Sequence, residues 1–243
     1  MDRRLLILAG GVVLVVLLAA AGAYAYFFSG LRTSPKPLAV SSPSPSASAS
    51  PGAQTTSAPA SAALAGSWTV GPGSQAGYRV KEQFVGQSST HEAVARTSGV
   101  SGGFTASASS GGYQLSNVKV TVQLSGLQSV DQVAGFNVSQ RDRIVQNTLS
   151  VSRYPEAVFQ ASGVSVPASF DSGPLPVPGQ LTIHGVTKDV VASVQARTTA
   201  SGVEVVGSIP TRMTDFNVSP PQVPITTVQP DVTIEFQLEL TKS

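Results

Sequence analysis

The sequence of 243 residues contains no cysteine, two histidines and only 12% charged residues. The lack of cysteine excludes disulfides, thiolate nucleophiles, thiolate metal sites and a lipid attached to an N-terminal cysteine. His91 and His184 are far apart in the chain and form no His-X-X-X-His zinc motif, and no carboxylate-rich calcium loop occurs. We therefore expect neither a metal site nor a cofactor.

The formal net charge is +2 and the pI is 9.0, which by themselves suggest an anionic partner. The positive excess comes from the N-terminal segment, which contains Arg3, Arg4, Arg32 and Lys36. From Ser67 onward, 11 Lys and Arg residues stand against 12 Asp and Glu residues. The sequence therefore predicts no nucleic-acid partner.

One uncharged apolar run extends from Leu5 to Phe28. As a helix it would be about 36 Å long, enough to cross a hydrocarbon core of about 30 Å. A cleaved signal peptide is the alternative, since Ala-X-Ala patterns occur at Ala21–Ala23 and Ala23–Ala25, but the run is longer than a usual signal-peptide core. We expect residues 1–32 to be a single-pass anchor in the cytoplasmic membrane through residues 5–28, with the remainder extracytoplasmic, or secreted if the segment is cleaved.

Residues 33–66 are rich in serine, proline and alanine, as in the stretch PSPSASASPGAQTTSAPASAALAG. Such a composition buries too little apolar surface to offset the entropy of the chain. We expect a disordered linker over residues 33–66 and a folded domain over residues 67–243.

From Ser67 onward, short runs alternate between apolar and polar residues and are separated by Gly, Pro, Ser and Asn. The clearest is Asp231–Leu240, whose apolar residues at every second position share one face, as in a strand with one buried side. The pattern predicts about eight, mostly antiparallel strands, near residues 68–70, 75–84, 94–104, 118–124, 157–164, 186–196, 203–209 and 231–240, with the short run 180–183 as the first strand of a hairpin that ends in 186–196.

Only Ser139–Leu149 has the pattern of a helix, with Ser139 as the expected N-cap and a short apolar stripe that includes Ile144 and Val145. One helix among about eight strands is typical of an all-β barrel or sandwich. A barrel of eight strands is either filled by side chains or holds one small ligand, as lipocalins do.

The motifs of catalysis are weak. No Gly-X-Ser-X-Gly motif occurs, and Ser116-X-X-Lys119 lies on an alternating strand rather than on a helix. We interpret Arg141 and Asp142 as capping residues of the helix, and His184 as part of the turn of a hairpin, where Gly185 provides the unusual backbone angle. The sequence predicts no catalytic residue and no enzyme activity. A hydrolase would require His184 or His91 to take part in catalysis.

The order of several segments resembles the YceI-like family of lipocalin-like proteins that bind polyisoprenoids or other lipids. The resemblance is carried by RDRIVQNTLSVSRYPEAVFQAS, then GQLTIHGVTKDV, then GSIPTRMTDFNVSPP and a closing alternating strand, and it covers nearly all of Trp68 to Leu240. Many members have a histidine where this chain has Ile144, and a histidine-serine pair where it has Gly73-Ser74. No ligand role is therefore transferred to a histidine.

The resemblance implies a lipocalin-like eight-stranded antiparallel barrel with one short helix and an elongated apolar channel for a long-chain lipid or isoprenoid. A lipid tail gains about 0.8 kcal/mol for each buried methylene, so such a channel requires mainly inward apolar side chains. We expect these to include Val120, Val122, Phe159, Val194, Val205, Ile234 and Phe236. The alternative is a cell-surface interaction module with a solidly packed barrel, and a homodimer is open in either case.

Overall fold

The computed structural model describes residues 14–22, 32–41, 64–86, 89–133 and 137–243. Its main body is an antiparallel barrel in which eight strands pair in the closed order β13-β12-β11-β9-β6-β5-β2-β15, with β15 returning to β13. The bounds of these strands are β2 Gly66–Val70, β5 Val100–Ser109, β6 Gly112–Gln123, β9 Glu156–Ala161, β11 Leu175–Ile183, β12 Val186–Thr198, β13 Val203–Arg212 and β15 Thr226–Lys242. The predicted all-β barrel of eight antiparallel strands is confirmed.

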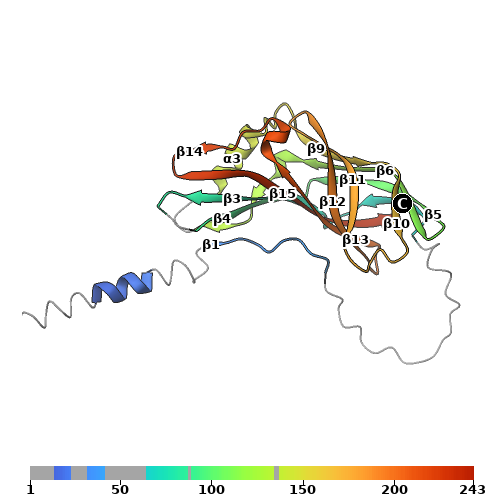
Figure 1. Cartoon of the computed structure of the whole chain (residues 1–243), viewed down its shortest axis with the longest axis horizontal. Helices are drawn as coiled ribbons and strands as arrows, with labels where there is room; N and C mark the ends of the chain where they lie inside the picture. The colour runs from blue at the N-terminus through green and yellow to red at the C-terminus, as the bar shows by residue number, and fades with distance from the viewer. Residues whose placement is uncertain (1–13, 23–31, 42–63, 87–88, 134–136) are drawn as a thin grey trace, which may run out of the picture.

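Further elements pack around the closed barrel. The long strand β15 pairs with β2 through its last residues and with β3 between Thr226 and Gln237, and β3 pairs with β4. In Figure 1, α3 and β14 lie at one end of the barrel, and β5 and β10 lie at the other. We call these the α3 end and the β5–β6 end. The remaining elements are β1 Arg32–Thr33, β3 Gln75–Phe84, β4 His91–Thr97, β7 Gln128–Ser129, β8 Gln132–Val133, β10 Val164–Pro167, β14 Gln222–Val223, α3 Ser139–Thr148 and the 3-10 turns η1 Leu124–Gly126 and η2 Met213–Phe216.

Two of the predicted strands are interrupted. The strand predicted over residues 94–104 is divided between β4 and β5 by Ser98 and Gly99, and each part pairs with a different neighbour. The strand predicted over residues 157–164 ends at Ala161, and β10 starts after Gly163, whose φ of 66° turns the chain. The alternation of side chains predicts the strands, whereas these turns depend on local backbone geometry.

The helix α3 begins and ends almost where the sequence predicts it, but its N-terminal cap is different. Ser139 does not act as the cap acceptor; its backbone N–H and its hydroxyl both donate to Oδ1 of Asn137, over 3.1 and 2.6 Å. The predicted Ser139 cap is therefore wrong, because the residue two positions earlier provides the acceptor. Replacing Asn137 with alanine should lower the free energy of unfolding by about 1 kcal/mol in urea titration, whereas an unchanged midpoint would show that this contact contributes nothing.

The predicted anchor at residues 5–28 lies largely outside the described residues. Of this run the structure describes only residues 14–22, which are helical. None of the helices in the described parts of the chain has both the length and the apolar character needed to cross a membrane.

The first part of the predicted linker lies against the barrel, in contrast to the disorder expected there. Residues 34–41, which we call the strap, follow β1 and cross the outer face of the sheet. At one end the hydroxyl of Ser34 donates to the backbone oxygen of Glu92 over 2.5 Å. At the other end, the N–H and hydroxyl of Ser41 donate to the carboxylate of Glu204 over 2.8 to 3.1 Å.

The middle of the strap covers a group of buried charges on the outer face. The Glu235 carboxylate accepts hydrogen bonds from Arg79 Nε at 2.6 Å and from Arg96 Nε at 2.8 Å. The same two guanidinium groups donate to backbone oxygens of the strap, Arg79 to Pro35 over 2.6 Å and Arg96 to Lys36 over 2.9 Å. The alternation of apolar and polar residues in Asp231–Leu240 correctly predicts that Glu235 points away from the barrel interior. The strap covers Glu235, however, so this residue is only 2% exposed. Of the remaining predicted linker residues, 42–63 lie outside the described residues. Residues 64–66 belong to the barrel instead of the linker, since Leu64 lines the inner cavity and Gly66 begins β2.

The contact between Ser41 and Glu204 should depend on pH. Burial by itself raises the pKa of Glu204, but the hydrogen bonds from Ser41, Gln237 and Arg197 more than offset it and hold the pKa below its ordinary value. The stabilisation is therefore fully present above pH 4.5 and is lost as the pH falls through the lowered pKa. Hydrogen exchange of the Ser41 amide is followed by NMR from pH 6 to pH 3 and divided by its intrinsic rate. The resulting protection should fall on acidification in the unmodified protein and should be independent of pH in Glu204→Gln. Equal profiles for both proteins would contradict this linkage.

Candidate functional site

The interior of the barrel contains two adjoining cavities. The inner cavity, of about 200 Å³, lies between the strands of the closed barrel. The mouth cavity, of about 280 Å³, lies at the α3 end beneath α3 and η2. The two cavities share four wall residues, so they lie next to each other along the barrel; these are Ala76, Val122, Ala157 and Ile234.

The inner cavity has an apolar wall. All seven side chains predicted to line a channel do line it, namely Val120, Val122, Phe159, Val194, Val205, Ile234 and Phe236. Among the described residues that form this wall there is no charged side chain. Whether these seven residues contact a ligand stays a prediction, but the geometry places them around one common space.

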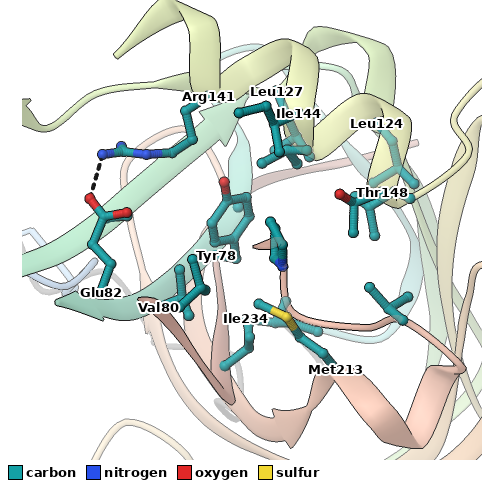
Figure 2. A pocket seen from close by; sticks show the side chains of 18 of the residues that line it. Tyr78, Val80, Glu82, Leu124, Leu127, Arg141, Ile144, Thr148, Met213 and Ile234 are labelled. Atoms are coloured by element: carbon teal, nitrogen blue, oxygen red, sulfur yellow. Dashed lines mark hydrogen bonds and ion pairs between the residues drawn. The ribbon is translucent and has the colours of Figure 1, made fainter. Parts of the chain in front are cut away.

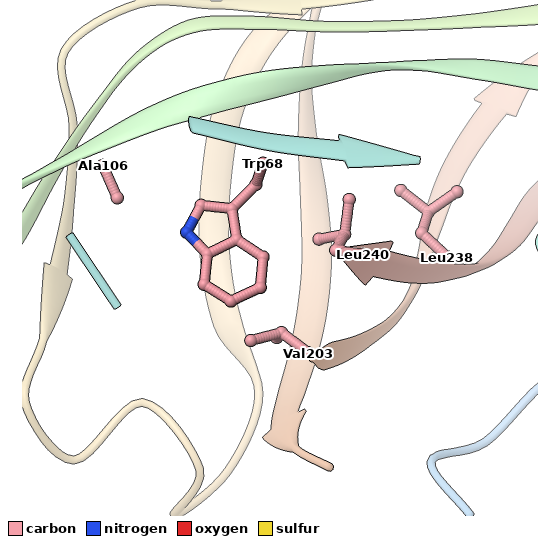
Figure 3. Close-up of a cluster of buried hydrophobic side chains, with 5 residues drawn as sticks. All are labelled: Trp68, Ala106, Val203, Leu238 and Leu240. Carbon is pink, nitrogen blue, oxygen red and sulfur yellow. The ribbon is translucent and has the colours of Figure 1, made fainter. Parts of the chain in front are cut away.

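A cluster of buried side chains packs where β2 meets the last residues of β15. Trp68 lies among Ala106, Val203, Leu238 and Leu240, as Figure 3 shows. Trp68 Nε1 donates to the backbone oxygen of Leu64 over 2.8 Å, which satisfies the polar group of the buried ring. The indole therefore forms a fixed part of the inner cavity wall, which Trp68 also lines.

The mouth cavity has a more mixed wall, which the sequence did not predict. Figure 2 shows Ile144 and Thr148 of α3 on one side and Met213 and Ile234 on the other, with the ring of Tyr78 between them. The apolar stripe of the predicted helix indicated that Ile144 faces the interior. The opposite wall comes from β3, β15 and η2, which are remote from α3 in sequence, so no local pattern indicated that these elements meet.

A buried group of charges lies beside this cavity. Arg141 donates to Glu82 over 2.6 Å and to Oδ1 and Oδ2 of Asp131 over 2.7 and 2.9 Å, and His91 Nε2 lies 2.7 Å from the same Oδ2. The side chains of Glu82, His91 and Asp131 are at most 5% exposed. Arg141 is therefore the cation that connects α3 to β3 and to the segment that follows β7.

Burial and charge move the two carboxyl groups in opposite directions. Burial raises the pKa of Glu82 above its ordinary value, against the opposing charges of Arg141 and His91. Burial has the same effect on Asp131, but hydrogen bonds from His91 and Arg141 more than offset it and hold the pKa of Asp131 below its ordinary value. Of these two carboxyl groups, Asp131 is therefore the one that the fold stabilises in its ionised form.

Glu82, His91 and Asp131 have the chemistry of a metal site, since one ligand atom of each lies within 4.8 Å of the others. The guanidinium of Arg141 already contacts both carboxylates. A cation bound there would lie next to this positive charge and would have to compete for the same oxygens. The geometry therefore fits an ion-pair cluster better than a metal centre.

The interpretation of Arg141 and Asp142 as capping residues needs correction. Arg141 points to the buried carboxylates described above and lines the mouth cavity. Asp142 accepts hydrogen bonds from the N–H and the hydroxyl of Ser129 over 2.9 and 2.7 Å. Both residues attach the first turn of α3 to other parts of the barrel. Their partners Glu82, Asp131 and Ser129 lie outside the helix, so the sequence of the helix alone does not indicate this role.

Tyr78 contributes a polar group to the mouth cavity wall. Burial raises its pKa well above the ordinary value near 10, so the phenol stays neutral. Among the described residues, no protein group forms a hydrogen bond with its hydroxyl, which borders the cavity. The side chain can therefore donate one hydrogen bond to a molecule in that cavity.

His184 is a turn residue, as the sequence predicted. It has a φ of 52°, followed by Gly185 with 74°, and these two residues join β11 to β12. Its Nδ1 lies 3.3 Å from the backbone oxygen of Phe216, and its Nε2 lies 3.3 Å from the hydroxyl of Ser150. These contacts tie the turn to η2 and to the end of α3.

Comparison with known proteins identifies one family. Residues 74–240 match the model of the YceI-like domain. No curated protein matches the chain. Among solved structures, BcnA of Burkholderia cenocepacia is 17% identical, with a TM-score of 0.48 over 69% of this chain and 96% of that chain.

Two further solved structures are similar to this chain. A polyisoprenoid binding domain from Saccharophagus degradans, implicated in plant cell wall breakdown, is 14% identical, with a TM-score of 0.47 over 72% of this chain and 98% of its own. A YCEI protein of Campylobacter jejuni is 19% identical, with a TM-score of 0.40 over 60% and 84%.

Proposed function

We propose, from the premise that this chain belongs to the YceI-like domain family, that its barrel binds a long-chain amphiphile such as a polyisoprenoid and is not an enzyme. The observation that carries the proposal is the apolar inner cavity, which adjoins a mouth cavity at the α3 end. An apolar tail would lie in the inner cavity, and the polar end of the molecule would lie near Tyr78 and Arg141.

The energetics favour a long apolar tail over a small polar ligand. Each methylene transferred from water gains about 0.8 kcal/mol, so a five-carbon isoprene unit contributes a few kcal/mol before the costs of ordering. The wall of the inner cavity offers such a tail apolar contacts and no charge. A charged small molecule would lose its hydration there without compensation.

The single tryptophan of the chain provides a direct test. Because Trp68 lines the inner cavity, a conjugated-polyene fatty acid bound there should quench its fluorescence by energy transfer. We expect saturable quenching that an unlabelled polyprenol reverses. Absence of saturable quenching, together with no bound lipid, would contradict the proposal.

Tyr78→Phe tests where the polar end lies. A neutral hydrogen bond of this kind contributes about 0.5–1.5 kcal/mol, so affinity for a polyprenol should fall about two- to tenfold. Affinity for a polyisoprene hydrocarbon without the hydroxyl should not change. Competition against the polyene probe measures both, and an equal loss for the two ligands would show that Tyr78 only packs against the tail.

The alternative function, an interaction module with a solidly packed barrel, fits the interior less well. A scaffold of this kind would fill the space between its strands with side chains, as small barrels can. The two cavities leave space in this barrel instead. They therefore favour lipid binding over a purely structural role.

We further propose that the barrel is tethered outside the cytoplasmic membrane by residues 5–28. The support is the uncharged apolar run, which is long enough to span a bilayer, and the Ser/Pro-rich segment that follows. Alkaline carbonate extraction of membranes tests this, because an anchored chain stays with the lipid. Release of the intact chain into the supernatant would contradict it.

A further inference from the structure

We infer that the α3 end of the barrel rests on the lipid surface to which the chain is anchored, so that the mouth cavity opens toward the bilayer. The inference rests on the proposed membrane anchor. It follows from where the strap begins, how firmly the strap is held, how short the chain before it is, and which side chains are exposed at that end.

The strap begins at the α3 end. β1 pairs with β8, which directly follows Asp131, and Asp131 contacts Arg141 of α3. Ser34 bonds Glu92, the second residue of β4. The chain therefore joins the barrel close to the turn between β3 and β4, on the side of the mouth cavity.

The strap is held by buried charges, so it fixes this point of attachment. Glu235, 3% exposed in its side chain, binds both Arg79 and Arg96. These guanidinium groups also bind backbone oxygens of the strap. Releasing the strap would remove the charge-assisted hydrogen bonds that both guanidinium groups donate to its backbone, so these contacts hold the start of the strap in place.

The chain between the proposed anchor and the strap is short. About six residue steps separate Phe28 from Ser34, which span at most about 20 Å. Val85 lies about 13 Å along β3 from Lys81, the partner of Glu92. The β5–β6 end is much farther from Glu92, because β5 alone extends about 30 Å from Val100 to Ser109. The tether thus allows the α3 end to reach the membrane surface but not the β5–β6 end.

The tip at the α3 end offers apolar side chains to such a surface. Val85 is 72% exposed and Ile225 is 48% exposed, among the most exposed large apolar residues of the barrel. The two residues are adjacent, since Val85 N–H donates to the Ile225 backbone oxygen over 3.0 Å. Ile225 also lines the mouth cavity, so a lipid surface in contact with this tip would lie at the entrance to the interior.

The absence of cysteine makes this orientation measurable with one label at a time. The full-length variants Val85→Cys and Ser110→Cys place an environment-sensitive fluorophore on exposed residues at opposite ends. They are reconstituted in phosphatidylcholine–phosphatidylglycerol vesicles that contain spin-labelled phospholipid. We expect the label at position 85 to be quenched at least several-fold more than the label at position 110, and Ile225→Cys to behave like Val85→Cys.

Equal quenching at both ends, in protein that stays with the vesicles, would overturn the orientation alone. Protein that washes off the vesicles would overturn the anchor and the orientation together. Polyene binding by the same samples is measured separately in detergent, so a failure of lipid binding is distinguishable from either result. Inserting a Gly/Ser spacer of about 20 residues between Ser29 and Gly30 should abolish the difference between the two ends, and persistence of the difference would contradict the role of the short tether.

Discussion

Val194→Trp is expected to reduce the affinity for a long-chain amphiphile by about two orders of magnitude while the barrel stays folded. Val194 points into the inner cavity, where an indole would occupy space otherwise open to the tail. Displacing three or four methylenes at about 0.8 kcal/mol each costs about 3 kcal/mol, which corresponds to about a 100-fold loss. Polyene titration measures the affinity, and thermal unfolding checks the fold.

The next residue along β12 offers a matched control. Gln195 is exposed on the outer face of the barrel, so Gln195→Trp adds the same side chain without entering the cavity. Its affinity should stay within about twofold of the unmodified protein. Full affinity in Val194→Trp, with the fold intact, would place the ligand elsewhere.

Arg141→Ala should lower the free energy of unfolding by about 3–5 kcal/mol, because it leaves two buried carboxylates without their shared cation. Arg143→Ala is the control, since Arg143 is exposed on the same helix and its loss should cost at most about 0.5 kcal/mol. Urea titration of both variants at pH 7 measures the difference. Equal stabilities would show that Arg141 does not stabilise the cluster.

The penalty in Arg141→Ala should shrink on acidification. Burial raises the pKa of Glu82 in the folded protein, so protonated Glu82 is favoured by folding, and this stabilisation is lost as the pH rises through the folded pKa. Once Glu82 is neutral, it no longer requires the guanidinium. The difference between the variant and the unmodified protein should therefore be largest at pH 7 and smaller as the pH falls toward 4.5, and a constant difference would assign the effect to lost packing.

The strands and the inner cavity could be predicted from the sequence, because successive side chains of a strand point alternately into and out of the barrel. Alternation in Asp231–Leu240 identifies the side chains that face inward, and Ile234 and Phe236 are indeed in the cavity wall. The family resemblance added the closure of the strands into a barrel. Position along a strand was then sufficient to assign the lining residues.

The strap and the charge cluster could not be predicted, because they depend on pairs far apart in the chain. Ser41 meets Glu204, and Arg141 meets Glu82, only after the barrel has closed. No local pattern distinguishes Glu235 from an ordinary solvent-exposed acid of an amphipathic strand; the covering strap makes the difference. The Ser/Pro/Ala composition of residues 33–66 likewise predicted disorder uniformly, although the first residues of that range lie on the sheet.

The central claim is that the barrel interior is a lipid site, and its most direct test is chemical. The intact chain is purified from membranes, extracted with organic solvent and analysed by mass spectrometry, with Val194→Trp purified in parallel. We expect a long-chain amphiphile near one molecule per barrel, and a much smaller amount in Val194→Trp. An extract without such a molecule, from protein that also fails to bind the polyene or a polyprenol, would contradict the account.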